Sequence, residues 1–260
     1  DHKGRYWCAT FGGGLDEYFP ETGKFKAYKV HEGKNSISTN TVHGVFEASD
    51  GTLYIGSLGG GLIQFYPDSE IFQVYHHVPG NAGTPSNDDL EYFCETPSGL
   101  IYFTTQGGGL NVFDPRKKQF RAFTTADGFS SNIMSGIIED NRGTLWLSTM
   151  GGISSFVPPE NPFTPDCKIS IRNYNTNDGL PCNEFQFGGT WKSGKGILYF
   201  GTACGKVVYF NPDELKENKF VPPVFITGFS INNRPVIPSD TNKFLQRNTE
   251  FTKEITLGYR

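Results

Sequence analysis

Residues 51–67 read GTLYIGSLGGGLIQFYP, and this stretch contains the pattern that decides the fold. Its order is a glycine, an aromatic residue, a hydroxyl residue, a glycine-rich turn, a branched apolar residue, then an aromatic residue and a proline. The same order recurs in four further stretches, 4–20, 99–115, 143–158 and 196–212. Counted at Leu15, Leu62, Leu110, Ile153 and Val207, the copies lie 47, 48, 43 and 54 residues apart, a period in the range of propeller blades.

Each period contains short apolar runs that predict strands and no run that predicts a helix. In the second copy these runs are 41–47, 53–57, 61–66 and 71–76, separated by residues that favour tight turns. A four-stranded sheet cannot bury both of its faces alone, so such sheets stack around an axis, with their large aromatic residues packed between them. We therefore predict an all-β fold, a β-propeller fragment of about five four-stranded blades with an incomplete first blade, followed by the opening strands of a β-sandwich.

The repeat ends after Pro212, and alternating β segments are predicted at 220–229 and 251–259. We divide the chain into a partial propeller, residues 1–219, and a linker with the start of a second β domain, residues 220–260. Roughly five blades are fewer than most such rings contain, which indicates a piece of a longer protein. Because the end blades of a partial ring expose apolar faces, self-association or poor stability is expected for the isolated chain.

The composition restricts the possible partners. The 260 residues include 32 glycines and 16 prolines, with 15% aromatic residues and a net charge of −4. Phosphate binding requires clustered Lys and Arg, so no direct contact with nucleic acid is expected. The chain contains no apolar run near the roughly 20 residues that span a bilayer, so no direct membrane contact is expected.

Two stretches resemble a known family. Residues 130–149, SSNIMSGIIEDNRGTLWLST, resemble the two-component regulator propeller repeat. Residues 178–185 together with 196–212 resemble the closing repeat of the periplasmic sensor region of hybrid two-component histidine kinases. Residues 222–227, PPVFIT, resemble the lead into the immunoglobulin-like Y-Y-Y domain of those sensors.

The resemblance implies a location on the periplasmic side of the inner membrane of a Gram-negative bacterium, in a membrane-anchored protein. It also implies an oligosaccharide or other carbohydrate ligand, whose signal passes through the immunoglobulin-like domain to a kinase and to transcription regulation. The implied partners are the rest of the sensor kinase chain, including a second propeller, and we expect the full-length protein to be a homodimer. No kinase signature is present in these residues, so the chain is predicted to have no catalytic residue and no cofactor.

The rim that carries the glycine turns is the predicted place for a ligand. The loop between the second and third strands of a blade opens on the same rim as the linker between blades, and loops on a rigid scaffold commonly carry function. The residue just before each glycine turn varies on a fixed frame, which suits recognition, although drift of exposed residues explains it as well. The ligand-binding candidates are Phe11, Leu58, Gln106 and Met150 at these turns, and Asn40, His43, Tyr92, Asn132, Asn183, Gln186 and Trp191 near them.

Two other functional classes stay open. A propeller hydrolase or lyase is one, since Glu47, Glu95 and Glu139 recur at the end of the first strand. An active site needs different residues in different blades, so a recurring acid more simply caps or hydrogen-bonds the repeat. The other class is a protein-interaction scaffold, which the fold alone does not separate from a sensor.

Histidines and cysteines do not predict a metal site. The five histidines lack metal-ligand spacing, and no metal is expected. Cys8 and Cys94 lie in strand runs, where buried free thiols are predicted. A bridge between Cys182 and Cys204 remains an alternative, because cysteine connectivity cannot be read from a sequence.

Overall fold

The computed structural model describes residues 1–33, 35–164, 166–215, 225–239, 241 and 244–257. The chain divides into two compact units, Asp1–Leu215 and Lys216–Arg260, and each is described by itself. The domain boundary predicted between residues 219 and 220 lies outside the described residues.

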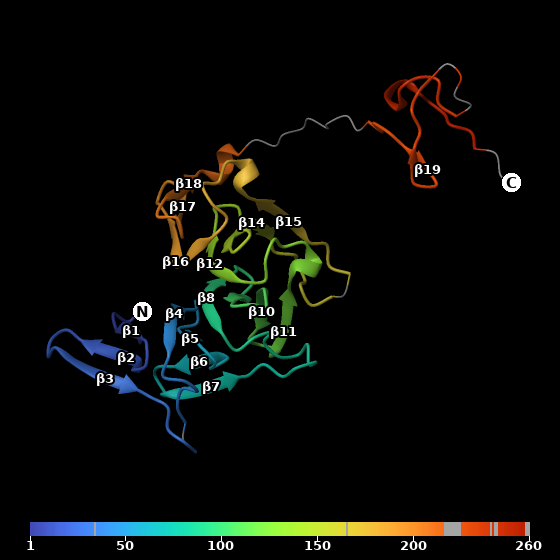
Figure 1. Cartoon of the computed structure of the whole chain (residues 1–260). Helices are drawn as coiled ribbons and strands as arrows, with labels where there is room; N and C mark the ends of the chain where they lie inside the picture. Colours follow the sequence, from blue (N-terminus) through green and yellow to red (C-terminus); the bar gives the residue numbers. More distant parts are fainter. Residues whose placement is uncertain (34, 165, 216–224, 240, 242–243, 258–260) are drawn as a thin grey trace. The chain divides into compact units, whose positions relative to one another are not determined.

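The described part of the first unit forms five antiparallel sheets, one for each copy of the repeat (Figure 1). The first sheet contains β1 (Tyr6–Thr10), β2 (Gly14–Phe19) and β3 (Lys24–Tyr28). The second contains β4 (Val42–Glu47), β5 (Leu53–Ser57), β6 (Leu62–Tyr66) and β7 (Ile71–Tyr75). The third contains β8 (Leu90–Glu95), β9 (Ile101–Thr105), β10 (Leu110–Asp114) and β11 (Gln119–Phe123).

The fourth and fifth sheets repeat this order. The fourth contains β12 (Met134–Glu139), β13 (Leu145–Thr149), β14 (Gly152–Val157) and β15 (Ser170–Tyr174), and the fifth contains β16 (Phe185–Lys192), β17 (Leu198–Thr202) and β18 (Val207–Phe210). Short 3-10 helices are η1 (Thr125–Asp127), η2 (Thr176–Asp178) and η3 (Pro212–Glu214). The predicted propeller fragment is confirmed, including the incomplete first blade, which begins at the position of a second strand. The fifth sheet differs from the prediction, because its described residues form three strands and not four.

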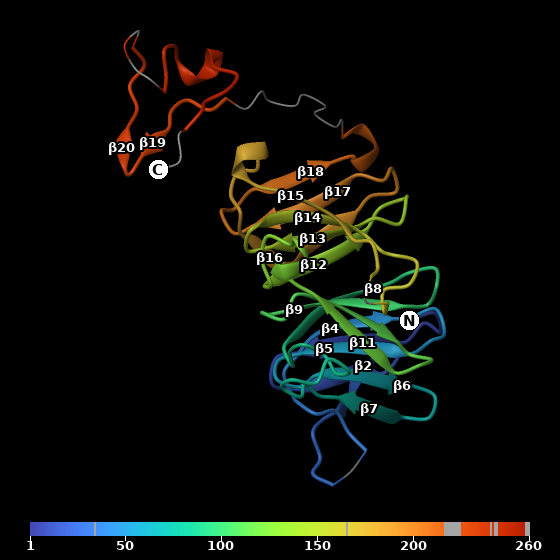
Figure 2. The ribbon, with the colours of Figure 1, turned by 90° about the vertical axis from the view of Figure 1, so that its right-hand side faces the viewer.

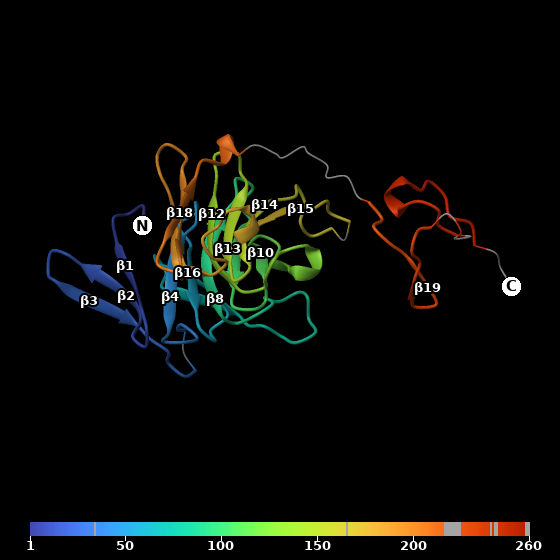
Figure 3. The same cartoon turned by 45° about the horizontal axis from the view of Figure 1, so that its top comes forward.

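The first strand of each sheet from the second onward lies innermost. β4, β8, β12 and β16 run side by side at the centre, and the outer strands β7, β11 and β15 lie at the periphery (Figures 1 and 3). Turned by 90°, the sheets appear as successive layers (Figure 2). The inner strands therefore form a common hub, toward which every sheet presents one edge.

The hydrophobic core lies between the sheets. Tyr102 and Leu110 of the third sheet pack with Leu147 and Phe156 of the fourth in one buried cluster. Fully burying a side chain of this size stabilises the fold by about 1.5–3 kcal/mol. Similar clusters join the first sheet to the second, the second to the third and the fourth to the fifth. The repeated aromatic residues thus pack between blades, as predicted.

The hydroxyl residue and the glycines of the repeat build the turn between the second and third strands. The hydroxyl donates a hydrogen bond of 2.7–3.3 Å to the carbonyl oxygen at the far end of the turn, from Thr10, Ser57, Thr105, Thr149 and Thr202. The last turn glycine has a positive φ, 70° at Gly61, and a Cβ there would lie 2.3 Å from the Tyr75 carbonyl oxygen. Only glycine fits this close approach.

The proline-rich insert of the fourth copy folds against the third sheet. Arg121 of β11 donates hydrogen bonds to the carbonyl oxygens of Pro162, at 2.6 Å, and Thr164, at 2.5 Å. Phe163 joins the core between the third and fourth sheets. The insert therefore covers the outer edge of that core before β15 begins.

The second unit has little regular structure among its described residues. It contains a short hairpin of β19 (Ser230–Ile231) and β20 (Arg234–Pro235), and the 3-10 helix η4 (Thr249–Phe251). The strands predicted at 220–229 and 251–259 are wrong for their described parts, since 225–229 and 251–257 contain no strand. Alternation alone does not make a strand, because the backbone groups also need a neighbouring strand to pair with. Among all described residues, no helix is long and apolar enough to cross a membrane.

Candidate functional site

The glycine turns and the linkers between sheets share one rim, as predicted. Both Gly12 and Gly14 donate their backbone N–H to the carbonyl oxygen of Asn40, at 3.0 and 2.8 Å. Gly107 and Gly109 bind the carbonyl oxygen of Asn132 in the same way, at 3.1 and 2.9 Å. Each of these turns is thereby held by the linker that leads into the next sheet.

The linker carries a second repeated contact through its Asn or Asp side chain. The Oδ1 atom accepts a hydrogen bond from the backbone N–H two residues after the end of the outer strand. The pairs are Asn40 with Val30 at 2.9 Å, Asp88 with His77 at 2.6 Å, Asn132 with Thr125 at 2.8 Å and Asn183 with Thr176 at 3.0 Å. Three predicted ligand contacts, Asn40, Asn132 and Asn183, therefore use their Oδ1 atoms to shape the rim.

A register shift at the start of each inner strand places one polar side chain at an equivalent position near the rim. The shifts lie between Val42 and Gly44, Leu90 and Phe93, Met134 and Gly136, and Phe185 and Thr190. The equivalent polar residues are His43, Glu91, Ser135 and Gln186. The four sheets thus have four different polar side chains at one repeat position, and two of them, Glu91 and Ser135, are buried.

Two of these residues, His43 and Glu91, form a cluster with the turn residues Phe11 and Gln106. His43 Nδ1 lies 3.0 Å from Glu91 Oε2, and Gln106 Nε2 donates to Glu91 Oε1. The Phe11 ring stacks on the His43 ring with centroids 5.7 Å apart and planes 9° apart. We call these four residues, Phe11, His43, Glu91 and Gln106, the hub cluster.

The hub cluster combines a buried anchor with an exposed surface. Glu91 is 1% exposed, whereas the Phe11 ring is 79% exposed. A buried carboxylate is stable only with hydrogen-bond donors beside it, which the imidazole and the amide provide. The cluster therefore offers an exposed aromatic ring to a molecule at the rim, and the buried Glu91 fixes the His43 ring on which Phe11 stacks.

Tyr92 occupies the hub beside this cluster. A Cβ on Gly188 would lie 2.3 Å from the Tyr92 hydroxyl, so the ring of β8 reaches β16. Burial raises the pKa of Tyr92, and the nearby Glu91 raises it further. A cavity of about 200 Å³ adjoins Glu91 and Tyr92 and is also lined by Gly44, Val45, Phe46, Phe93 and Ile137.

The remaining predicted residues have different surroundings. Leu58 and Met150 are 39% and 38% exposed at their turns and, with Ile133 at 39%, add apolar surface to the rim. Gln186 is exposed on β16. Trp191 is 61% exposed and contacts Tyr199 of β17 at 5.4 Å between ring centroids, so it belongs to the uncovered face of the fifth sheet.

Sequence reasoning missed Glu91 and Ser135. Both are equivalent to predicted residues, because His43, Glu91, Ser135 and Gln186 each follow the first residue of an inner strand. Aligning the copies at this strand start would have found them. Ser135 is fully buried and donates to Ser148 at 3.2–3.3 Å, so of the two only Glu91 joins the hub cluster.

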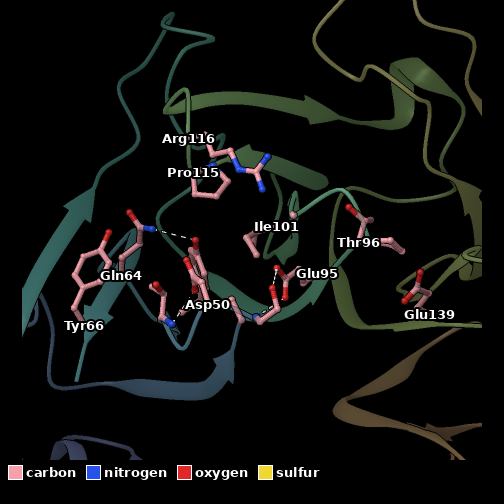
Figure 4. A pocket seen from close by; sticks show the side chains of 15 residues that line it. Asp50, Gln64, Tyr66, Glu95, Thr96, Ile101, Pro115, Arg116 and Glu139 are labelled. Carbon is pink, nitrogen blue, oxygen red and sulfur yellow. Dashed lines mark hydrogen bonds between the residues drawn. The ribbon is translucent and has the colours of Figure 1, made fainter. Parts of the chain in front are cut away.

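A larger pocket of about 540 Å³ lies beside the turns between the first and second strands of the second and third sheets (Figure 4). Gln64 Nε2 donates to the Tyr54 hydroxyl at 3.0 Å inside it, and burial raises the pKa of Tyr54. The charged residues that line this pocket are Asp50, Glu95, Arg116 and Glu139.

The second copy of the repeat differs from the fourth beside this pocket. In the fourth sheet, Trp146 Nε1 donates to Asp140 Oδ2 at 2.9 Å. The second sheet has Tyr54 and Ala48 at these two places, and both line the pocket.

The repeated glutamates connect neighbouring sheets. Glu47 accepts from the His2 backbone N–H at 2.9 Å, and Glu95 accepts from the N–H and hydroxyl of Ser49, both at 2.7 Å. The position that Glu139 would bind is Pro97, which has no N–H to donate. Hydrogen bonding to the repeat, which the sequence predicts for this acid, is confirmed for Glu47 and Glu95.

Residues 128–151 match the family described as "Two component regulator propeller". The chain carries the two-component regulator propeller repeat. The matched residues run from the linker before β12 to the glycine turn after β13, which are the parts that build the rim.

The chain is similar to parts of much longer proteins. The chain is 26% identical over 278 residues to "Histidine kinase P4" of Formosa agariphila, covering 97% of this chain and 18% of the kinase. Two extracellular domains of hybrid two-component systems from B. thetaiotaomicron share its fold at 20% identity. Their TM-scores are 0.66 and 0.55, with 90% and 92% of this chain covered against 32% and 38% of theirs. The chain spans about a fifth of the kinase and about a third of each extracellular domain.

The same fold occurs in enzymes. Virginiamycin B lyase from Staphylococcus aureus superposes with a TM-score of 0.53 at 16% identity, covering 81% of this chain and 67% of the lyase. At this identity the likeness concerns the fold alone, so it assigns no lyase chemistry to the regulator propeller.

Proposed function

We propose that this chain is part of the extracytoplasmic, ligand-sensing region of a hybrid two-component histidine kinase. The similarity to a histidine kinase over 97% of the chain and the regulator propeller repeat support this role. The kinase, the immunoglobulin-like Y-Y-Y domain in residues 220–260, a second propeller, inner-membrane anchoring and homodimerisation belong to the same proposal. In this scheme the chain itself binds and does not catalyse.

The proposed ligand is a carbohydrate bound at the hub cluster. The observation that carries this step is the exposed Phe11 ring, which stacks on the His43 ring that hydrogen-bonds to the buried Glu91. A sugar presents an apolar face that packs on an aromatic ring, and hydroxyl groups that hydrogen-bond to polar side chains such as the partly exposed His43 and Gln106. Pockets for small polar ligands combine apolar surface with a few fixed polar groups in this way.

A glycan-binding screen followed by calorimetry tests the proposal on this chain and on the full-length protein. Binding of a saccharide without turnover supports sensing, and release of product would indicate a hydrolase or lyase. If no saccharide binds to either protein, the sensing proposal fails for carbohydrates and a protein-interaction scaffold becomes the better explanation.

Variants locate the site once a saccharide is found. Phe11→Ala and Gln106→Ala are expected to weaken binding about tenfold or more, because each removes a contact of the hub cluster. Arg116→Ala changes the pocket of Figure 4 and serves as the matched control, with unchanged affinity expected. Loss of binding in Arg116→Ala with normal binding in Phe11→Ala would move the site to that pocket.

A further inference from the structure

In three sheets a serine ties the incoming linker to the glycine turn of the same sheet. The Ser38 hydroxyl donates to the Gly60 carbonyl oxygen at 2.6 Å, and Ser86 donates to that of Gly108 at 2.8 Å. In the fourth sheet, the Ser130 hydroxyl lies 3.1 Å from the Thr149 hydroxyl. The fifth sheet has Pro181 at this position, which has no hydroxyl group to make the contact.

The fifth sheet has two cysteines at the places next to this missing contact. Cys182 follows Pro181 in the linker, and Cys204 lies in the turn between β17 and β18. The Glu184 carbonyl oxygen accepts from the Ala203 N–H at 2.9 Å and from the Cys182 thiol at 3.5 Å. The linker and the turn are therefore already held together, with one thiol on each side.

The third sheet brings its linker and turn equally close at these two positions. Asn87 and Gly107 are the residues equivalent to Cys182 and Cys204, since each pair has the same offset from the linker Asp or Asn and from the turn hydroxyl. A Cβ on Gly107 would lie 3.6 Å from Nδ2 of Asn87, although Gly107 has a positive φ that Cys204 does not share. In the fifth sheet itself the Cys182 side chain lies within hydrogen-bond reach of Cys204.

The surroundings of the Cys204 thiol favour reaction. Hydrogen bonding by the Cys182 side chain lowers the pKa of Cys204, and a hydrogen bond with Thr202, at 3.3 Å, acts in the same direction. Cys204 is exposed, whereas burial raises the pKa of Cys94 to about 12. Reactive thiols are exposed ones with a lowered pKa, and Cys204 has both properties.

We propose that Cys182 and Cys204 form a disulfide that replaces the serine contact and fastens the linker to the turn of the fifth sheet. The oxidant is an external disulfide, as supplied in an oxidising compartment. The Cys204 thiolate attacks one sulfur of that disulfide, the S–S bond of the oxidant breaks, and its other sulfur leaves as a thiolate. The Cys182 thiolate then attacks Cys204 in the mixed disulfide and releases the second thiolate, so the oxidant takes up two electrons and the protein loses two protons.

Peptide mapping tests the bond directly, and it does not depend on the identity of any ligand. The chain is equilibrated with oxidised glutathione, alkylated and digested with trypsin, which separates Cys182 in residues 173–192 from Cys204 in residues 196–206. We expect the two peptides to be recovered as one linked species, two hydrogens lighter than their sum. Reduction before alkylation should yield both peptides separately and alkylated.

Single variants provide the controls. In Cys182→Ser and in Cys204→Ser the remaining cysteine should be alkylated, and the rise of the thermal midpoint on oxidation, roughly 5–10 °C in the wild-type chain, should disappear. Cys8→Ser is the matched variant that should keep both the linked species and the shift. Alkylation of both Cys182 and Cys204 after glutathione treatment, or pairing of either with another cysteine, would overturn the proposal while leaving the sensing role intact.

Discussion

The third and fifth sheets are copies of one repeat in opposite surroundings. Leu110 and Val112 on β10 are 0% exposed, whereas Val207 and Tyr209, at the same positions on β18, are 62% and 67% exposed. The fourth sheet covers this face of the third, and no described residue covers the same face of the fifth. These apolar residues therefore form one half of an interface between sheets, and their burial depends on whether a neighbouring sheet is present.

Substitutions at the matched positions Leu110 and Val207 are expected to differ strongly in their effect on stability. Leu110→Ala is expected to lower the free energy of unfolding by about 3 kcal/mol, because it opens a cavity between the third and fourth sheets. Val207→Ala should lower it by less than about 0.5 kcal/mol, because its side chain already contacts solvent. Urea unfolding of both variants measures the difference, and equal losses would show that β18 is buried in solution.

The uncovered face also predicts self-association. Trp191, Tyr199 and Tyr209 form a row of rings with centroids 5.4 and 5.8 Å apart, and two of them are more than half exposed. Exposed apolar patches of this kind promote contact between chains. Tyr209→Ser is expected to weaken association of the isolated chain about tenfold in sedimentation velocity. Tyr66→Ser, on the second sheet, is the control, and a monomeric wild-type chain would contradict the prediction.

The fold could be predicted from the sequence because its determinants are local and repeated. The hydroxyl of Ser57, the close approach at Gly61 and the aromatic pair Phe65 and Phe72 each act within one copy or between adjacent copies. Five copies of the same pattern favour one arrangement, in which neighbouring sheets stack and pack their apolar residues against each other. The segment after residue 215 has no such repetition, and its alternating pattern did not identify strands.

The candidate site could be predicted only in part. The rim position of Phe11 and Gln106 follows from the order of strands, and His43 follows from its place near the inner strand. The buried Glu91 that joins them depends on a register shift after Leu90, where two residues depart from strand pairing. An alternating pattern does not contain such a bulge, so the sequence did not distinguish Glu91 from an ordinary strand residue.

The glutamate at the end of the first strand is present in the third sheet and replaced by a lysine in the fifth. Glu95 of the third sheet accepts two hydrogen bonds from Ser49, whereas the fifth sheet has Lys192 at that position. Glu95→Gln is expected to lower the free energy of unfolding by about 1 kcal/mol, since hydrogen bonds to a charged acceptor are weakened. Lys192→Gln is the matched change, with a loss of less than about 0.5 kcal/mol expected in the same urea titration. A larger loss in Lys192→Gln would mean that the lysine has a structural partner in solution.

Glu139 of the fourth sheet occupies the same repeat position as Glu95 and Lys192. Burial raises its pKa from 4.5, and Lys192 only partly opposes this effect. At Glu47 burial acts in the same direction, but the hydrogen bonds from His2 outweigh it and the pKa is lowered. At this repeat position the ionised carboxylate of Glu47 is stabilised, because the neighbouring turn donates hydrogen bonds to it. The ionised carboxylate of Glu139 is destabilised, because Pro97 stands in the neighbouring turn and has no N–H to donate.

The smallest predicted effect tests the sign of this difference. A raised pKa means that the folded state binds the Glu139 proton more tightly than the unfolded state, so the ionised carboxylate destabilises the fold at pH 7. Glu139→Gln should therefore increase the free energy of unfolding at pH 7, by no more than about 1 kcal/mol because the group is partly exposed. The gain should shrink as the pH falls through the raised pKa and vanish below 4.5, where the glutamate is protonated in both states. Glu47→Gln should show the opposite sign at pH 7, and a loss of stability in both variants would mean that Glu139 has a hydrogen-bond donor in solution.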